Sequence, residues 1–385
     1  MSFTSIVSPE DQRVTFVELF FDLVFVFAVT QIVNLLHDGV GWGAAAEALL
    51  VFWLVWWGWT QFTWALNAAD TTHHLVALGT LVATAVAFFM AVAVPDAFHG
   101  GAAWFAIPYV LVRMIGLGLY GWVAAVADPS QYAAVCTFAL VSLGGLAAVL
   151  VGGFAGGSTQ YWLWGLAIVL DVIAAAVGAR SEAWNLHPEH FAERHGLFVI
   201  IALGESLIVA AGGVTEGPWT DDLIVVAILA VALTCALWWT YFSGAKAELD
   251  HALASVRGDV QSIMASQVFS LAHFPMLCGV IACAVAIEAA VAQPAAPLAL
   301  GARLALALGV ALFVGGMVVA VWRATRRVLL SRLLIVAATT VAIAVAVAAP
   351  VLSLGIAFCG VAAVAAWEQW RGPAAGGALA PRTVA

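Results

Sequence analysis

The stretch VTFVELFFDLVFVFAVTQIV, residues 14–33, is almost entirely apolar, yet it carries Glu18 and Asp22. A segment of about 20 apolar residues is long enough to cross the hydrocarbon core of a bilayer as an α-helix. Residues four apart share one face of a helix, so the two carboxylates form a polar stripe on which Asp22 lies about 6 Å deeper than Glu18. Because a charge in contact with lipid is strongly unfavourable, we expect this stripe to face the interior of a helix bundle or a polar cavity.

The composition indicates that the whole chain, and not only this segment, is embedded in a membrane. Of the 385 residues, 64% are hydrophobic and 9% are charged, whereas a soluble domain averages about 45–50% apolar and about 25% charged residues. The sequence therefore predicts an all-α integral membrane protein of about twelve transmembrane helices. The predicted spans are 14–36, 45–67, 73–94, 102–126, 132–152, 160–180, 190–213, 222–245, 260–291, 299–321, 330–349 and 351–367.

The basic residues orient these spans, because Lys and Arg accumulate on the cytoplasmic side of a membrane. With the N-terminus placed inside, eleven of the 13 basic residues fall on the cytoplasmic side, and only Arg113 and Arg303 do not. Both termini should then be cytoplasmic. The basic residues are scattered along the chain and the net charge is −9, so no nucleic-acid partner is expected.

Two sequence features recur and suggest an internal repeat. Phe16–Glu18 is matched by Phe191–Glu193, and the tryptophan pair at 56–57 is matched by the pair at 238–239. Each match joins one span to the sixth span after it, so the two halves should have the same orientation in the membrane. The predicted segments are a cytoplasmic N-terminus (1–13), a first six-helix repeat (14–180), a cytoplasmic linker (181–189), a second six-helix repeat (190–367) and a disordered cytoplasmic tail (368–385).

A second stretch, HPEHFAERHGLFVIIALGES at residues 187–206, also places charges in an apolar span. Glu193 and Arg194 should lie at its cytoplasmic mouth, after a helix N-cap at Asn185. Glu205 follows about 18 Å deeper, near the middle of the bilayer. We therefore take Glu205 as a candidate binding residue, with Ser206 beside it as an accessory.

Other polar residues lie within predicted spans. Arg113 and Asp171 have comparable depths, and pairing is the usual remedy for an intramembrane arginine, so we expect an ion pair between them. His273 lies at mid-depth in the ninth span. The histidines around Glu193 match no zinc motif, and neither a metal nor a cofactor is expected.

The second span holds five tryptophans, of which those near its middle are too deep for the membrane interface. These side chains either pack in the core or line a pocket, where they could stack on a flat or cationic ligand. The five are Trp53, Trp56, Trp57, Trp59 and Trp64.

Two blocks of this sequence, about 175 residues apart, resemble the bacterial low temperature requirement protein A family. The first is ELFFDL at residues 18–23, and the second is ERHGLFVIIALGES at residues 193–206, in which the family carries E-R-x-G-L-F-x-x-x-x-L-G-E-S. The resemblance implies a multi-pass protein of the bacterial inner membrane, linked by its name to growth in the cold. It implies no substrate.

These observations favour a secondary transporter or an ion or proton pathway over an enzyme. In this interpretation Asp22, Glu205, Glu18 and Glu193 bind an unknown small solute, ion or proton, while Arg113, Asp171 and Arg194 form ion pairs or a gate, with His273 and Ser206 as accessory residues. Two alternatives remain open: a membrane enzyme that acts on lipid or isoprenoid through the cytoplasmic His/Glu/Arg cluster, and a sensor or scaffold. Asp22 also has a purely structural interpretation, in which it only neutralises an arginine.

Overall fold

The computed structural model describes residues 6–9, 12–36, 41–178, 184, 186–216 and 219–371. Within these ranges every extended regular element is a helix, and the one β-bridge is the isolated antiparallel pair of Val7 and Ala69. The cap predicted at Asn185, the linker residues 181–183 and the tail beyond residue 371 lie outside the described residues.

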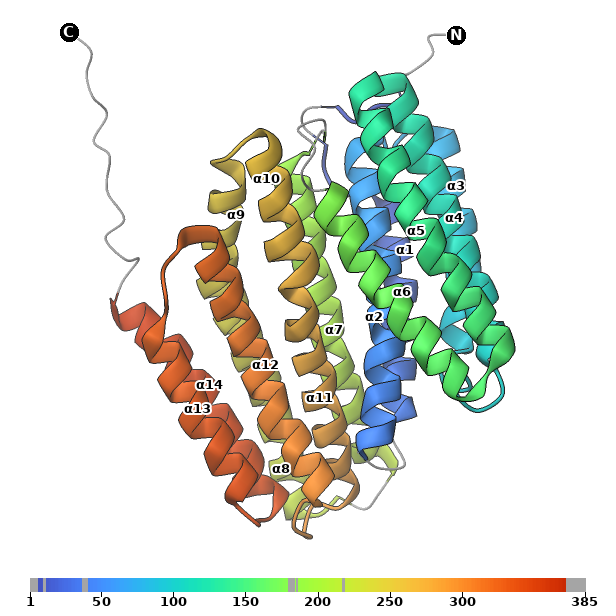
Figure 1. Cartoon of the computed structure of the whole chain (residues 1–385). Coiled ribbons are helices and arrows are strands. Elements are labelled where there is room, and N and C mark those ends of the chain that lie inside the picture. Colours follow the sequence, from blue (N-terminus) through green and yellow to red (C-terminus); the bar gives the residue numbers. More distant parts are fainter. Residues whose placement is uncertain are drawn as a thin grey trace, which may run out of the picture.

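Twelve continuous helices run through the described chain (Figure 1). The first six are α1 (Phe16–Leu35), α2 (Trp42–Ala68), α3 (His74–Val92), α4 (Ala102–Ala127), α5 (Pro129–Ala155) and α6 (Gly157–Gly178). The next are α7 (Pro188–Glu216), then α8 (Asp221–Thr240) joined through the π-helical η1 (Tyr241–Ala245) to α9 (Lys246–Ala254), and α10 (Gly258–Met264) joined through the π-helical η2 (Ala265–Leu271) to α11 (His273–Ala292). The last are α12 (Leu300–Thr325), α13 (Leu330–Val345) and α14 (Pro350–Arg371).

The predicted all-helical, multi-span membrane architecture is confirmed. In the described chain, ten helices are long and apolar enough to cross a membrane. The remaining two of the twelve are α13, which has only 16 residues, and α2, whose side chains from Val51 to Ala68 are nearly all buried. A helix that is surrounded by protein does not face lipid, so α2 tolerates glutamine, asparagine and several tryptophans.

Several boundaries differ from the sequence prediction, and the largest difference is at the end of the eighth span. The eighth span continues to Ala254 and the ninth begins at Gly258, because both helices extend beyond their apolar stretches through π-helical turns. The eleventh and twelfth spans are separate helices. The last helix ends at Arg371, four residues later than predicted.

Local signals explain where several helices begin. Thr15 and Glu18 form a capping box at the start of α1, in which the backbone N–H of Thr15 donates to Oε2 of Glu18 at 3.0 Å. Asp128 caps α5 by accepting from the backbone N–H of Ser130 at 2.7 Å, and Pro129 occupies the first turn. Glu18 therefore has a structural role before any functional one.

The first six helices occupy one side of the molecule and the last six the other (Figure 1). Corresponding pairs pack together in each half: α1 packs on α3 as α7 packs on α11, and α4 packs on α5 as α12 packs on α13. The residues that suggested the repeat do not share an environment, because Glu18 is buried and Glu193 is exposed, and Trp56 is buried while Trp238 is 40% exposed. The repeat stays a prediction.

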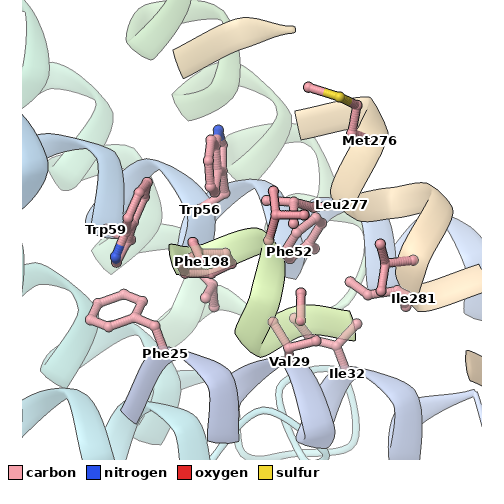
Figure 2. Packing of buried hydrophobic residues seen from close by; sticks show 14 of the residues in the cluster. Phe25, Val29, Ile32, Phe52, Trp56, Trp59, Phe198, Met276, Leu277 and Ile281 are labelled. Carbon is pink, nitrogen blue, oxygen red and sulfur yellow. The ribbon is translucent and has the colours of Figure 1, made fainter. Parts of the chain in front are cut away.

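A hydrophobic core joins the two halves at the junction of α1, α2, α7 and α11 (Figure 2). Side chains of Phe25 and Val29 from α1, Phe52 and Trp56 from α2, and Phe198 from α7 are at most 2% exposed. Burial of apolar area within a membrane protein is not driven by exclusion of water, so this junction depends on close packing and on polar contacts between helices.

We predict from the basic residues that reporter fusions after residues 40, 98 and 218 lie outside the cell, and that a fusion after residue 256, between α9 and α10, lies inside. An enzyme reporter active only outside and a fluorescent reporter active only inside measure this directly. If two of the three outer fusions report a cytoplasmic location, the predicted orientation is wrong.

Candidate functional site

Polar contacts between α1 and α7 occur at three levels. Glu18 contacts His190 with 3.0 Å between Oε1 and Nε2, Asp22 contacts Arg194, and the hydroxyl of Thr30 donates to Oε2 of Glu205 at 2.5 Å. The contacts follow the same order along both helices. The two helices therefore run parallel, as the prediction that both halves have one orientation requires.

Asp22 is held from two sides. Its Oδ1 accepts a hydrogen bond from the indole Nε1 of Trp59 on α2 at 2.7 Å, and the same oxygen contacts the guanidinium of Arg194. The guanidinium also lies 5.5 Å from the centre of the Trp59 ring, within the range of a cation–π interaction. Asp22 thus joins three helices at one point.

Glu18 is the more fully satisfied carboxylate of the pair. Oε2 accepts from the backbone N–H and the hydroxyl of Thr15 at 3.0 and 2.9 Å. Oε1 lies 3.0 Å from Nε2 of His190 and 3.6 Å from the guanidinium of Arg194. Oε2 of Glu18 is therefore hydrogen-bonded, whereas Oε1 has two nitrogens nearby but no hydrogen bond among the described residues.

Asn67 of α2 completes this cluster. Its Oδ1 accepts from the backbone N–H of His187 at 2.8 Å, and its Nδ2 donates to the backbone carbonyl of His187 at 3.0 Å. Nδ2 also lies 3.0 Å from Nδ1 of His190. The backbone of His187 thus fixes which way the amide points.

The cluster is sealed from solvent. Glu18, Asp22 and Arg194 are 0% exposed and His190 is 1% exposed. Each buried ion loses several kcal/mol of hydration free energy, which nearby counter-charges and hydrogen bonds must offset. Buried, charged and mutually paired groups at a junction between two halves make this cluster the main candidate site.

Glu205 lies at the other end of the same interface. It is 2% exposed, and within the described chain no basic side chain forms an ion pair with it. Ser206 is also buried, and its hydroxyl has no hydrogen-bond partner among the described residues. Arg194, the partner of Asp22, precedes Glu205 by eleven residues, which is about 16 Å along a helix. Asp22 and Glu205 are therefore on facing helices but do not form one site.

Glu193 lies elsewhere. It is on the exposed side of α7, and its neighbour Arg194 points into the cluster. Adjacent residues on a helix differ in direction by about 100°, so the sequence could not show which of the two faces the protein.

Arg113 of α4 and Asp171 of α6 lie together in the first half, with 3.3 Å between guanidinium and carboxylate. The hydroxyl of Tyr109 accepts from Arg113 at 2.7 Å, and Gln61 of α2 contacts the same guanidinium. Both charged groups are at most 2% exposed. The pair links α2, α4 and α6 and lies apart from the α1–α7 cluster.

His273 is held by the π-helical segments. Its Nε2 lies 2.8 Å from the hydroxyl of Tyr241 in η1, and its Nδ1 lies 2.9 Å from the carbonyl oxygen of Val268 in η2. Both ring nitrogens are used, which is the arrangement of a structural histidine. His195 lies between His273 and the α1–α7 cluster. The centre of its ring is 5.5 Å from that of His273 and 5.0 Å from that of Trp59.

Sequence reasoning missed Trp59, Asn67 and Thr30 as partners of the charged residues. A signal existed only for Asn67, as an amide side chain at the end of a predicted membrane span. Within the described residues, no three His, Cys, Asp or Glu side chains lie close enough to hold one metal ion.

A bundle of long apolar helices with ionic groups buried between them is a multi-span helical membrane protein. The family model of the bacterial low temperature requirement A protein (LtrA) matches residues 13–367. The chain therefore belongs to this family, and the resemblance seen at residues 18–23 and 193–206 is confirmed.

A relative in Rhizobium meliloti (strain 1021), described as uncharacterized protein RA0937, is 29% identical over 300 residues. The aligned region covers 74% of this chain and 72% of that protein. No solved structure matches the chain.

We predict that Asp171→Asn destabilises the protein by about 3–5 kcal/mol, because the substitution leaves the Arg113 charge buried without its counter-ion. The double variant Arg113→Met, Asp171→Leu removes both charges and should recover part of the lost stability. Thermal unfolding in detergent measures both. An unchanged melting temperature for Asp171→Asn would show that the ion pair does not stabilise the fold.

Proposed function

We propose that this protein is a secondary transporter of the bacterial cytoplasmic membrane, coupled to protons that bind at Asp22 and Glu205 between α1 and α7. One observation carries the proposal: the buried carboxyl groups of this interface outnumber the buried cations. The number of buried cations depends first on the charge of His190.

Asn67 determines the protonation of His190. One hydrogen of its Nδ2 goes to the carbonyl of His187 at 3.0 Å, and Nδ1 of His190 lies 3.0 Å from the same nitrogen. A nitrogen that faces the second amide hydrogen must be an acceptor, so Nδ1 carries no proton. His190 is therefore neutral, with its proton on Nε2 toward Glu18.

With His190 neutral, Arg194 is the only cation in the described cluster. Two ionised carboxylates against one guanidinium would leave a net negative charge with no access to water, which is strongly unfavourable. One carboxyl group should therefore hold a proton. Oδ2 of Asp22 and Oε1 of Glu18 both lack a hydrogen bond among the described residues, but Oε1 has the nitrogens of His190 and Arg194 at 3.0 and 3.6 Å, and no such charged or polar neighbour is described for Oδ2. We assign the proton to Oδ2 of Asp22.

Glu205 is also a buried carboxyl group, and it has no described counter-ion. Its described polar contact is the hydroxyl of Thr30, and no described arginine, lysine or histidine pairs with it. A protonated carboxyl group is far less unfavourable to bury than a carboxylate. Ionisable side chains within membrane spans commonly mark proton relays and ion pathways.

The position of these groups favours transport over the alternatives. They lie at two depths, about 16 Å apart, along one interface between two groups of helices, and in secondary transporters such groups commonly rock against each other around a binding site. An enzyme acting on lipid headgroups through the cytoplasmic His/Glu/Arg cluster would need that cluster accessible, whereas His190 and Arg194 are at most 1% exposed.

The proton assignment predicts unequal effects of two amide substitutions on the free energy of unfolding. Asp22→Asn imitates a protonated aspartic acid and should change the free energy of unfolding by less than about 1 kcal/mol. Glu18→Gln forces Asp22 to ionise in its place beside Arg194 and weakens the capping hydrogen bonds of Thr15, so it should destabilise by about 1–3 kcal/mol. Thermal unfolding in the same detergent compares the two. Strong destabilisation by Asp22→Asn would instead mean that Asp22 is the ionised group that neutralises Arg194.

Transport is tested by flux into liposomes that contain the purified protein and an internal pH-sensitive dye, against a panel of ions and small solutes. We expect a solute-dependent proton movement that Glu205→Gln abolishes, because the amide cannot carry a proton. Glu193→Gln, an exposed carboxylate on the same helix, is the matched control and should retain the flux. Absence of flux for every member of the panel would favour the sensor or scaffold alternative.

A further inference from the structure

An apolar groove runs along the lipid-facing surface of α12 in the second half of the molecule. It is formed by α11, α12, the connection after α12 and the start of α13, and its volume is about 460 Å³. The residues that line it include Leu312, Val319, Trp322, Val328 and Leu333, which are 37–59% exposed. Apolar side chains this exposed on a membrane helix face lipid, so the groove is open to molecules of the bilayer.

Three arginines lie at one end of this groove. Arg323 is in the last turn of α12, and Arg326 and Arg327 are in the connection to α13. The guanidinium carbons of Arg323 and Arg326 each lie 5.7 Å from the centre of the Trp322 ring, which is itself part of the groove wall. The positive charge therefore lies directly beside the apolar surface.

These arginines have no acidic partner within the described chain, since none of its ion pairs includes one of them. Arg323 donates to the side-chain oxygen of Gln267, which is a neutral group, while Arg326 and Arg327 are exposed. Neighbouring like charges repel one another, so this end of the groove favours an anion.

The backbone at Arg326 is unusual for an arginine. With φ at 60°, it is the one residue other than glycine that has a positive φ in the part of the chain that the structure describes. Its N–H donates to the carbonyl oxygen of Trp322 at 2.8 Å and so ends α12, at a position where helices commonly place glycine. Because a Cβ is unfavourable in this conformation, the fold alone would favour glycine over arginine here.

The arginines lie at the level of the phospholipid headgroups. Val328 and Leu330 are 59% and 60% exposed, so the apolar region of the membrane begins immediately after Arg327. The contact between Arg323 and Gln267 of η2 places this end of α12 on the side of α9 and α10, which is predicted to be cytoplasmic. Basic pockets between helices on that side of a membrane bind the headgroups of anionic lipids.

We propose that this groove binds one anionic phospholipid of the cytoplasmic leaflet. The lipid phosphate pairs with the guanidinium groups of Arg326 and Arg327, and one acyl chain lies along α12 against Trp322 and Val319. Guanidinium groups suit this role because they bind phosphate through two parallel N–H donors. Binding here does not depend on proton coupling between α1 and α7, so a failure of the transport proposal leaves it standing.

The test is native mass spectrometry of the purified full-length protein in detergent. The anionic probe is dioleoyl phosphatidylglycerol, and dioleoyl phosphatidylcholine is its zwitterionic counterpart with the same acyl chains. We expect one phosphatidylglycerol molecule to bind about 25-fold more tightly than phosphatidylcholine. The double variant Arg326→Gly, Arg327→Gln should remove this preference, since each arginine contributes about fivefold, equivalent to about 1 kcal/mol.

Arg326→Gly alone separates lipid binding from stability. Glycine removes the charge and also suits the positive φ, so phosphatidylglycerol should bind about fivefold more weakly while the melting temperature stays the same or rises. Arg257→Gln is the matched control, because Arg257 is exposed on the same side and donates to the carbonyl oxygens of Ala254 and Val256. This control should bind the lipid like the unaltered protein.

Gly315 tests the apolar part of the site. It lines the groove, and a Cβ added there would meet no atom within 4 Å outside its own stretch of helix. Gly315→Leu should therefore fill the groove without disturbing the fold, and should weaken phosphatidylglycerol binding about fivefold. Gly165→Leu on α6, where an added Cβ is equally unobstructed, is the control and should leave binding unchanged.

Glycerol 3-phosphate, which carries the phosphate without acyl chains, should not displace the lipid at equal concentration. The proposal is overturned if it does, if neither lipid is retained, or if phosphatidylglycerol and phosphatidylcholine bind equally well. It is also overturned if Arg326→Gly binds phosphatidylglycerol as Arg257→Gln does, or if Gly315→Leu binds it like the unaltered protein.

Discussion

Arg194 is a guanidinium group with no access to water, and the junction between the two halves is organised around it. Removing such an ion from water is unfavourable by several kcal/mol, and the arginine is retained only because partners converge on it. Two carboxyl groups come from α1 and an indole ring from α2. The carboxyl groups stand out in an otherwise apolar first helix because they are the partners of a cation on another helix.

The polar contacts around Arg194 also show how α1 and α7 are oriented relative to each other. Since Glu18, Asp22 and Thr30 meet His190, Arg194 and Glu205 in the same order, α1 and α7 must run parallel. Successive spans cross a membrane in alternating directions, so two helices that are six spans apart also run parallel. The polar contacts and the order of the spans therefore agree. Apolar packing around Phe25, Trp56 and Phe198 then fills the space beside the polar contacts (Figure 2).

The sequence predicted the membrane environment, the helical class and the family, because hydropathy, helix length and two local motifs depend on neighbouring residues only. It placed Arg113 and Asp171 at one depth, and the structure brings them together. It could not show that Glu193 faces away while Arg194 faces inward, or that Asn67 orients His190, because these depend on the rotation of a helix and on contacts over 120 residues of sequence. Asp22 and Glu205 were expected at one site because both are deep carboxylates, yet they lie at different levels.

The central claim is that Asp22 holds a proton and that the ionised Glu18 balances the charge of Arg194. Infrared difference spectroscopy of the purified protein at neutral pH measures this directly, because a protonated carboxyl group absorbs in a region free of carboxylate bands. The account predicts that the protonated-carboxyl band lost in Asp22→Asn shifts when only the aspartates carry ¹³C at the side-chain carboxyl carbon. A lost band that shifts only when the glutamates carry the label would contradict it.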